Sequence, residues 1–304
     1  MTVPLIECVP NFSEGRRPEV LEALAASVRA VPRTRLLDLS ADPDHNRAVL
    51  TFVGDGEAVL DAALRSAAVA VERIDLGVHT GVHPRIGAVD VVPFVPLYQA
   101  SIAACAALAR RFGERLASRF AIPVYLYAEA DPRRRGLAAI RRGGFEGLRT
   151  SIADPERRPD FGPARVHPSG GAVAVGARGI LIAFNVNLES SDLRAARAVA
   201  RIIRESGGGL PAVQAMGFPL PSRGVVQVSM NLLDYHRTPP LLALQRVAVE
   251  AARLDIAVAD AEIVGCAPRE ALPPDPATAL RLRSLRPGQI LDPARLASAM
   301  GTGD

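Results

Sequence analysis

The amino-acid sequence predicts an α+β fold in which two units repeat one order of elements: strand, helix, strand, strand, helix, strand. The chain has 304 residues, 49% of them hydrophobic, which is enough for one large core or two smaller ones. Short apolar and branched runs alternate with amphipathic helical periods in both halves. A segment rich in proline, glycine and charge at 154–171 divides the halves and predicts a linker.

The first half contains each element in that order. The predicted elements are a strand at 5–10 (LIECVP), a helix at 18–31, strands at 35–40 (RLLDLS) and 47–54 (RAVLTFVG), a helix at 56–75 and a strand at 88–95 (AVDVVPFV). A further helix at 98–120 and a strand at 122–127 (IPVYLY) extend this half.

The second half repeats the order without repeating the sequence. The predicted elements are a strand at 180–188, a helix at 191–206, strands at 211–218 and 224–235, a helix at 239–254 that opens with proline, and a strand at 256–266. Short helical pieces follow at 275–285 and 293–300. The sequence therefore predicts two tandem ferredoxin-like domains, 1–165 and 166–304.

Side-chain alternation predicts a polar face on the second sheet. Residues of like parity on a strand share a face, and the first and third strands of such a unit lie side by side. The polar residues of like parity on these strands are Asn185, Asn187, Gln227, Ser229 and Asn231. They line either a solvent-washed face or a polar ligand wall between the two units.

Composition excludes several classes of function. All 36 lysine or arginine positions are arginine, so a lysine Schiff base, a pyridoxal site and a Walker lysine are excluded. The net charge is +4, but arginines alternate with acids along the helices and aromatic residues make up only 4%. This pattern is typical of solvated helix faces, and we expect no nucleic-acid partner.

Three scattered cysteines favour a reducing compartment over a disulfide framework. The amino terminus lacks the pattern of a signal peptide, and no apolar run approaches the ~18 residues of a membrane span. We therefore expect a cytoplasmic protein with no membrane partner.

Two acids stand inside apolar strands of the first half. Glu7 lies in the first predicted strand and Asp90 in the fourth. A buried charge is costly unless it is paired, so we expect both acids to meet Arg47 or Arg85, or to face a ligand. Salt bridges with a purely structural role are the alternative.

The segment HTGVHPR at 79–85 carries two of the five histidines of the chain. The glycines and the proline disfavour a helix there, and the segment supplies no third metal ligand, so we expect no metal. A neutral imidazole can take a proton near neutral pH, and an adjacent arginine can hold an anion. The segment is therefore either a catalytic loop or a loop with solvated bystander histidines.

Several motifs together resemble the glutamate formimidoyltransferase family. They are ECVPNFSEG (7–15), HNRAVLTFVG (45–54), HPRIGAVDVVPFVP (83–96), PVYLYAEA (123–130), DFGP (160–163), LIAFNVNL (181–188) and QVSMNLLDY (227–235). The resemblance covers nearly the whole chain. It implies transfer of a formimino group from N-formimino-L-glutamate to N5 of tetrahydrofolate during histidine breakdown. It also implies a homodimer and a folate tunnel between the two ferredoxin-like subdomains.

The resemblance also implies roles for individual residues. The histidine of the HPR triplet, His83, is the general acid and base. The folate-binding stretch maps onto Gly162, Pro163, Ala164, Arg165, Val166, His167, Pro168, Ser169, Gly170 and Gly171, so the segment read as a linker is also a binding segment. Arg47 and Arg85 are expected to hold the carboxylates of the donor. The remaining expected substrate-binding residues are Asn46, Asn185, Asn187, Asn231, Asp90 and Glu7.

The chain departs from better-known members of that family at several positions. Ser40, Thr80, Val82, Gly170 and Gly179 stand where those members carry Asp, Lys, Glu, Trp and Lys. These changes affect the charge near the expected base, stacking near folate and the expected recognition of its polyglutamate tail. Two alternatives to the family activity therefore stay open: a divergent one-carbon transferase that uses a formyl donor, and a folate-binding protein without turnover.

Overall fold

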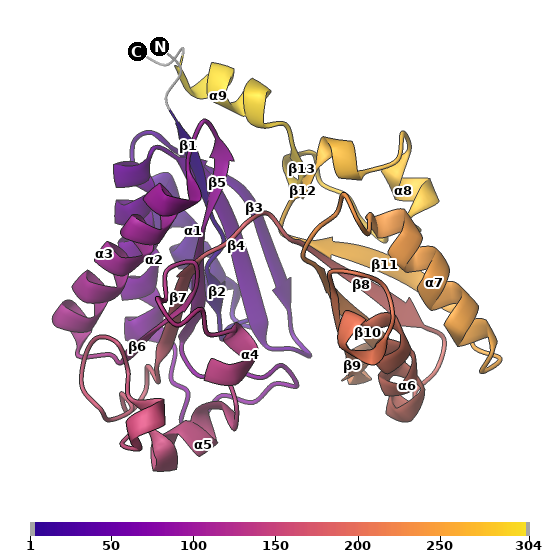
Figure 1. The fold of residues 1–304 in the computed structure, drawn as a ribbon, viewed down its shortest axis with the longest axis horizontal. Helices are drawn as coiled ribbons and strands as arrows, with labels where there is room; N and C mark the ends of the chain where they lie inside the picture. Colours follow the sequence, from indigo (N-terminus) through magenta and orange to yellow (C-terminus); the bar gives the residue numbers. More distant parts are fainter. Residues whose placement is uncertain (1–3, 302–304) are drawn as a thin grey trace. The chain divides into compact units, whose positions relative to one another are not determined.

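In a computed structural model, residues 4–301 are described and the chain divides into two compact units (Figure 1). The first unit holds the chain up to Gly179 together with the segment from Pro293 onward, and the second holds Ile180–Asp292. Each unit combines helices with a sheet, so the predicted mixture of helices and sheets is confirmed.

The first unit contains the longer series of elements. Its strands are β1 (Leu5–Cys8), β2 (Asn11–Phe12), β3 (Thr34–Asp42), β4 (Arg47–Gly54), β5 (Val89–Tyr98), β6 (Val124–Ala128) and β7 (Val173–Ala177). Its helices are α1 (Pro18–Arg29), α2 (Gly56–Arg73), α3 (Ile102–Phe120), α4 (Leu137–Ile140), α5 (Gly144–Ser151) and α9 (Pro293–Gly301), with a 3-10 turn, η1, at Pro155–Arg157.

These strands form one sheet. β1 and β2 lie between β4 and β5, and β3 pairs with β4, all antiparallel. β7 and β6 continue the sheet beyond β5 as parallel strands. The helices α1, α2 and α3 cover one face, where Leu24, Leu60 and Phe112 join the core around Phe52 and Phe94. The short helices α4 and α5 pack on the opposite face, against Tyr125 and Tyr127.

Local signals explain where the first-unit helices start. Asp55 caps α2 by accepting the N–H groups of Glu57 and Ala58, and Ser101 caps α3 by accepting the N–H of Ala104. The third helix therefore begins at Ile102 rather than at 98, because β5 runs on to Tyr98 before the cap.

The segment 154–171 does not divide the two units, so the linker prediction is wrong. It belongs to the first unit and is followed by β7, which pairs with β5 and β6 of that unit. The compact units divide at Gly179. The limits 1–165 and 166–304 for the two predicted subdomains stay a prediction.

The second unit has the predicted order of elements. It contains β8 (Ile182–Leu188), α6 (Leu193–Ile203), β9 (Val213–Leu220), β10 (Val225–Leu232), α7 (Pro240–Ala252) and β11 (Val258–Val264). Smaller elements are β12 (Ala267–Pro268), α8 (Pro276–Ala279), β13 (Ile290–Leu291) and the 3-10 turns η2 (Glu205–Gly207), η3 (Pro221–Arg223), η4 (Arg269–Ala271) and η5 (Pro287–Gln289). The main sheet is antiparallel in the order β11-β8-β10-β9.

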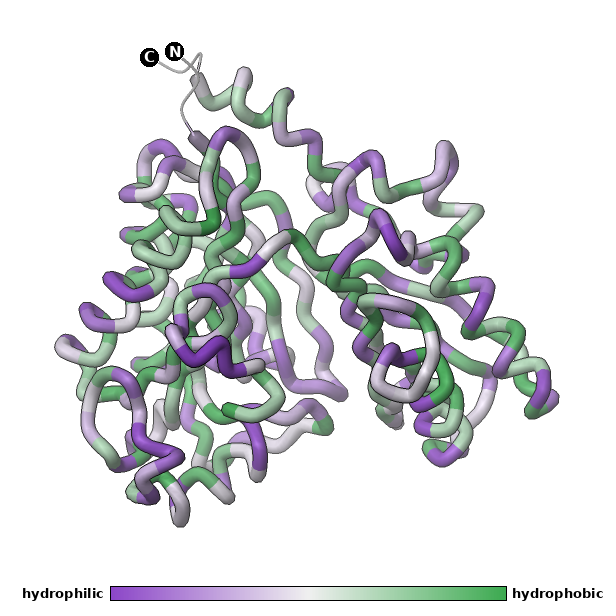
Figure 2. The backbone as a smooth tube through the Cα atoms, viewed as in Figure 1, coloured by the Kyte–Doolittle hydropathy of each residue, from purple (hydrophilic) through white to green (hydrophobic). Residues whose placement is uncertain are grey.

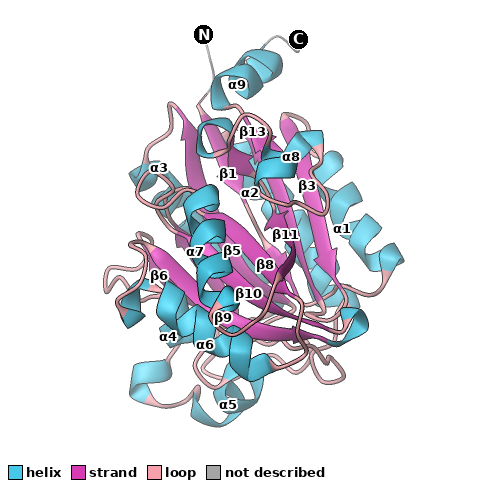
Figure 3. Cartoon of the chain, turned by 90° about the vertical axis from the view of Figure 1, so that its right-hand side faces the viewer, coloured by secondary structure: helices cyan, strands magenta, loops and turns pink. Residues whose placement is uncertain are grey.

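The two faces of this sheet differ in character. Phe184, Val186, Val228 and Met230 enter the core under α6 and α7, which cover one face (Figure 3). The pairing of Gln227 with Asn187 and of Ser229 with Asn185 gathers the amides on the other face, as predicted. In Figure 2 hydrophobic residues follow the strands of each unit, whereas hydrophilic residues gather in loops and on outer helix turns.

Candidate active site

A pocket in the first unit gathers residues from loops that are distant in sequence. About 180 Å³ of space, part of it open to solvent, is not filled by atoms. The lining residues are Phe12, Ser13, His45, Asn46, Arg47, His79, His83, Arg85 and Asp90. Arg47 opens β4 and Asp90 lies on β5, so the sheet supplies the floor on which the loops are held.

His83 lies in the loop between α2 and β5, outside any helix. The loop is fixed beside it, because the N–H of Val82 donates to the carbonyl of Asp44 at 3.2 Å. The ring of His45 stands 5.7 Å from that of His83, centroid to centroid. Burial and the nearby charges of Arg47 and Arg141 hold the pKa of His83 well below its usual value. The imidazole is therefore neutral at neutral pH and can accept a proton.

His79 joins two loops rather than standing free. Its Nε2 lies 2.9 Å from the carbonyl oxygen of Asn46, which requires a proton on Nε2. Its Nδ1 is buried and has no hydrogen-bond partner among residues 4–301. Burial lowers the pKa of His79 as well. The side chain therefore ties the loop that carries His83 to the loop before β4.

Asn46 is the centre of the loop arrangement. Its Oδ1 accepts the N–H of Gly15 at 2.9 Å, and its Nδ2 donates to the carbonyl of Thr80 at 2.8 Å. Its φ of 45° lies in the left-handed region, which asparagine tolerates better than most residues. A Cβ on Gly15 would stand 2.2 Å from the carbonyl oxygen of Asp42, and one on Gly81 2.4 Å from that of His45. Glycine at both positions allows the three loops to approach closely.

Arg47 lines the pocket with a guanidinium group that forms no ion pair within 4 Å among the described residues. Its Nη2 donates to Oδ1 of Asn11. No carboxylate of the described residues lies within 4 Å of its guanidinium, and its Nε is buried without an acceptor. Burial, with the charge of Arg141, lowers the pKa of Arg47 to about 10, so the side chain is still charged at neutral pH.

Neither Glu7 nor Asp90 forms the expected ion pair with Arg47 or Arg85, and whether Asp90 faces a ligand stays a prediction. Asp90 does not pair with Arg47 or Arg85: its Oδ2 pairs with Arg141, and its Oδ1 accepts the N–H of Ile86 at 2.8 Å. Arg85 instead pairs with Glu146 at 2.9 Å and donates to the carbonyl of His79 at 3.2 Å.

Glu7 is buried in β1 and does not line the pocket. Burial raises its pKa to about 7, against an opposing effect of the charge on Arg178. Within the described part of the chain, Glu7 has no ion pair shorter than 4 Å. Whether it contacts substrate stays a prediction.

The predicted folate segment, 162–171, lies against the loop of His83. The carbonyl of Ser169 accepts the N–H of Leu76, and the carbonyl of Gly170 accepts the N–H of Ala88, each at 2.9 Å. These bonds hold the start and the end of the loop. None of the lining residues of the pocket belongs to the segment, so its role in folate binding stays a prediction.

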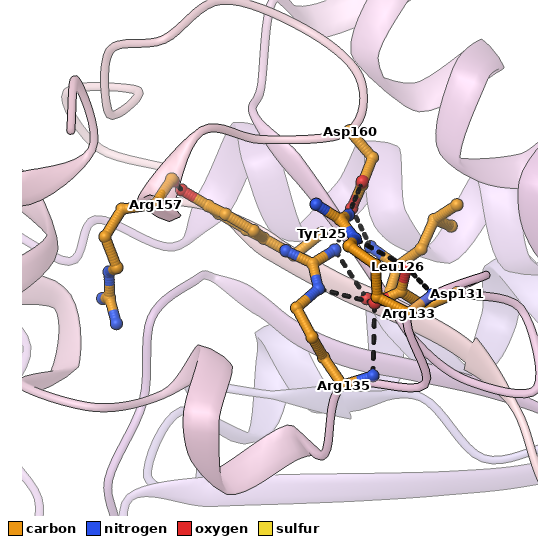
Figure 4. A network of polar contacts seen from close by, with 7 residues as sticks. All are labelled: Tyr125, Leu126, Asp131, Arg133, Arg135, Arg157 and Asp160. Carbon is orange, nitrogen blue, oxygen red and sulfur yellow. Dashed lines mark hydrogen bonds and ion pairs between the residues drawn. The ribbon is translucent and has the colours of Figure 1, made fainter. Parts of the chain in front are cut away.

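A network of ion pairs anchors the chain just before this segment (Figure 4). Asp131, whose side chain is fully buried, accepts from the Nε of Arg133 and of Arg135 at 3.1 and 2.5 Å. Both arginines also pair with Asp160, whose Oδ2 accepts the N–H of Leu126 at 2.7 Å. The network therefore fixes Asp160 to β6 and sets the course of the chain into Gly162.

Gly171 is required by the backbone at the end of the segment, and this leads to a prediction. Its φ is 71°, and a Cβ there would stand 2.2 Å from the carbonyl oxygen of Ile86. Gly171→Ala is expected to lower the free energy of unfolding by about 1 to 3 kcal/mol from the backbone conformation alone, and by more through the clash. Urea denaturation of the variant measures this loss.

Gly147→Ala is the matched control for that experiment. Gly147 lies in α5, and nothing stands within 4 Å of the position of its Cβ. Alanine is the better helix former, so this variant should be as stable as the parent or slightly more so. Equal stability of the two variants would contradict the account of Gly171.

The polar face of the second sheet is a hydrogen-bonded network. Gln227 donates to Asn187 and to Glu262, each at 3.0 Å. Asn185 donates to Glu262 at 3.0 Å, and Asn187 donates to Asp260 at 2.6 Å. Asn231 is exposed. The prediction that Asn185, Asn187 and Asn231 share a pocket with Arg47 and His83 stays a prediction, because these residues lie in different units.

Sequence reasoning missed several residues of these sites. His45 was quoted within a motif but not assigned to the pocket, although it stands two residues before Arg47. Arg141 carried no signal, because it is one of many arginines and its partner Asp90 is distant in sequence. Asp260 and Glu262 alternate along β11, so the parity rule that was applied to the asparagines could have found them.

No group of three or more His, Cys, Asp or Glu side chains in 4–301 is arranged to hold a metal ion. Over the same residues, no helix is both long enough and apolar enough to cross a membrane.

Comparison with known proteins identifies the family. The formiminotransferase domain, N-terminal subdomain, matches residues 5–178, and the formiminotransferase domain matches residues 183–275. A glutamate formimidoyltransferase of Thermoplasma acidophilum is 43% identical over 292 residues, which cover 95% of this chain and 96% of that protein. One of Streptococcus pyogenes serotype M1 is 39% identical, covering 88% of this chain and 90% of that protein.

The match extends to longer proteins. A formimidoyltransferase-cyclodeaminase of Mus musculus is 44% identical over 276 residues, which cover 88% of this chain and 51% of that protein. The chain thus spans about half the length of that relative. With both domain matches and these relatives, the chain belongs to the formiminotransferase family.

Proposed function

We propose that this protein transfers the formimino group of N-formimino-L-glutamate to N5 of tetrahydrofolate, with His83 as general acid and base. One observation carries the proposal: a neutral histidine and a largely uncompensated arginine line the same pocket, in a chain related to glutamate formimidoyltransferases. The reaction needs a group that moves a proton and a cation that holds a carboxylate.

The proposed reaction proceeds by addition and elimination. N5 attacks the amidine carbon, and the neutral His83 takes the proton that N5 loses. The imidazolium then gives this proton to the glutamate nitrogen, the bond between carbon and that nitrogen breaks, and glutamate leaves. The low pKa of His83 keeps the imidazole in its unprotonated form at neutral pH, and it makes the imidazolium a stronger acid for the second step.

We further propose that tetrahydrofolate is bound by the segment 162–171 and by the amide face of the second sheet, with each unit a ferredoxin-like subdomain and a tunnel between their sheets. The order of elements in both units supports the subdomain assignment. The contacts of Ser169 and Gly170 with the loop of His83 support the placement of folate near the base. A cytoplasmic homodimer that acts in histidine breakdown completes the proposal.

Three of the five departures from better-known family members, those at Thr80, Ser40 and Gly179, are compatible with this activity. Thr80, at a position of lysine in those members, accepts a hydrogen bond from Nη1 of Arg16 at 3.1 Å, so a cation is present at that position from another loop. Ser40 donates to Oδ2 of the buried Asp38 at 2.6 Å, which keeps a carboxylate two residues from the position of the missing aspartate. Around Gly179 there is open space.

The test is incubation of the purified protein with tetrahydrofolate and N-formimino-L-glutamate, followed by acid. The cyclised folate product that forms after acid is the expected result. Turnover with N-formylglutamate only would instead assign a formyl transferase. Tight binding of folinic acid without turnover of either donor would assign a folate-binding protein.

Arg47→Ala and Arg85→Ala are each expected to lower kcat/KM for N-formimino-L-glutamate. The loss of a charge-assisted hydrogen bond costs about 1.5 to 3 kcal/mol, or roughly 10- to 150-fold. The effect of Arg47 should be the larger, because Arg85 already pairs with Glu146, whereas no described carboxylate lies within 4 Å of Arg47. Lysine at either position should rescue activity only partly, because it lacks the paired N–H donors with which arginine binds both oxygens of a carboxylate.

N-formiminoglycine, which lacks the side-chain carboxylate, is the control donor for these variants. An arginine that holds the side-chain carboxylate should matter little with this donor. If both alanine variants lose as much activity with every donor, including donors without any carboxylate, these arginines serve folate or the fold instead.

A further inference from the structure

Arg141 places a second guanidinium beside His83. It directly follows α4, its side chain is only 14% exposed, and its Nη2 reaches Oδ2 of Asp90 in the wall of the pocket. The charges of Arg47 and Arg141 are, after burial, the main reasons why the pKa of His83 is low. The charges of both guanidinium groups therefore lower the pKa of the His83 imidazole.

These two cations share only one close ion pair with the described residues, that of Arg141 with Asp90. Asp90 is fully engaged, with one oxygen on Arg141 and the other on the N–H of Ile86. Asp42 attracts Arg47 only from beyond 4 Å, and its Oδ1 accepts the N–H of His45. Arg141 thus has a carboxylate within 4 Å, whereas Arg47 interacts with Asp90 and Asp42 only over longer distances.

The hydrogen bonds of the two arginines lead to the same conclusion as their ion pairs. Nε of Arg47 and Nε of Arg141 are both buried, and neither has an acceptor among the residues that the structure describes. A buried cation without a counter-charge is costly, and arginine donors suit a carboxylate in bidentate geometry. Arg47 therefore presents an unsatisfied donor in the pocket lining, and Arg141 presents one directly behind Asp90 of that lining.

We propose that Arg141 and Arg47 together bind the α-carboxylate of the donor, so that Arg141 is a specificity-determining residue. This inference rests on the proposed function. In the donor, the nitrogen that must receive the proton from His83 and the α-carboxylate are bonded to the same carbon. The α-carboxylate must therefore lie next to the base, whereas the side-chain carboxylate is separated from that carbon by two methylene groups. Arg85, which already pairs with Glu146, is left for the side-chain carboxylate.

Three donors separate the two carboxylates. N-formimino-L-glutamate carries both, N-formiminoglycine keeps only the α-carboxylate, and N-formimino-4-aminobutyrate lacks only the α-carboxylate. Arg141→Gln is expected to lower kcat/KM by roughly 10- to 150-fold for the first two donors and to leave the third nearly unchanged. Equal loss with all three donors would overturn the subsite.

Two further variants keep the test decisive. Arg142→Gln changes the adjacent, exposed arginine and should leave all three donors unaffected. Arg141→Gln with Asp90→Asn removes both charges of the buried pair, so that Asp90 is not left without its cation. The selective loss should persist in the double variant. Recovery of the parent's donor preference would assign the single-variant effect to a displaced Asp90 and would contradict the subsite.

Equilibrium binding distinguishes failure of this inference from failure of the proposed function. If the parent protein transfers from none of the three donors, the proposed function fails. Calorimetry with L-glutamate and 4-aminobutyrate in the presence of folinic acid still reports on the subsite. L-glutamate should bind more tightly than 4-aminobutyrate, and Arg141→Gln should abolish the difference. An unchanged difference would contradict the role of Arg141.

Discussion

His83→Ala is expected to lower kcat by roughly 10² to 10⁴ while folding and folate affinity stay nearly intact, because the variant loses only the group that moves the proton. Stopped assays of the folate product measure kcat, and titration with folinic acid measures affinity. Since the pKa of His83 lies well below 6.5, kcat/KM of the parent should not fall with His83 protonation until the pH is well below 6.5.

His79→Ala is the internal control for this prediction. His79 already uses Nε2 to hold the carbonyl of Asn46, so it is not free to shuttle a proton, and its loss should cost far less than that of His83. A comparable decrease in kcat for both variants would count against a single base. Loss of activity with a chelator would point to a metal instead.

Glu7→Gln is expected to change how stability depends on pH. Burial raises the pKa of Glu7 from 4.5 to about 7, so the folded protein holds this proton more strongly than the unfolded chain does. The stabilisation is complete below pH 4.5 and is lost as the pH rises through 7. The shift corresponds to about 3 kcal/mol. As the pH rises from 5 to 8, the parent should therefore lose about this much stability, whereas the variant should not.

Urea unfolding of parent and variant at pH 5 and pH 8 measures this loss. Glu72→Gln is the control for the substitution itself, because Glu72 is an exposed residue of α2. A difference for Glu7→Gln that is the same at both pH values would show that Glu7 is ionised throughout and that its pKa is not raised.

The sequence predicted the elements whose signals are local. The strands and helices of the βαββαβ order were found from periodicity, and the amide face of the second sheet was found from parity along β8 and β10. β7 was missed because its short run of Val, Ala and Gly follows directly on the segment that was read as a linker. A strand so rich in small residues is recognised by its parallel partners β5 and β6, which no local pattern reveals.

The pocket could be predicted only in part, for the same reason. His83, Arg47 and Asn46 stand in motifs with glycine or histidine neighbours that mark special backbone geometry. The pairing of Arg141 with Asp90 depends on how α4 packs against the sheet, and that packing follows from the buried contacts of Ile140 and Tyr125. A chain with so many arginines gives no indication of which one is buried.

The return of the chain to the first unit has a consequence for biosynthesis. The second unit is an insertion, since the chain leaves the first unit at Gly179 and re-enters it at Pro293 to form α9, which contacts β5. Ribosomes add about 5 to 20 residues each second, so translation of the inserted stretch delays completion of the first unit on the order of ten seconds. During this interval a nascent chain holds β5 without α9. Chaperones or the ribosome surface would then contact a first unit that still lacks α9, before synthesis of the chain is complete.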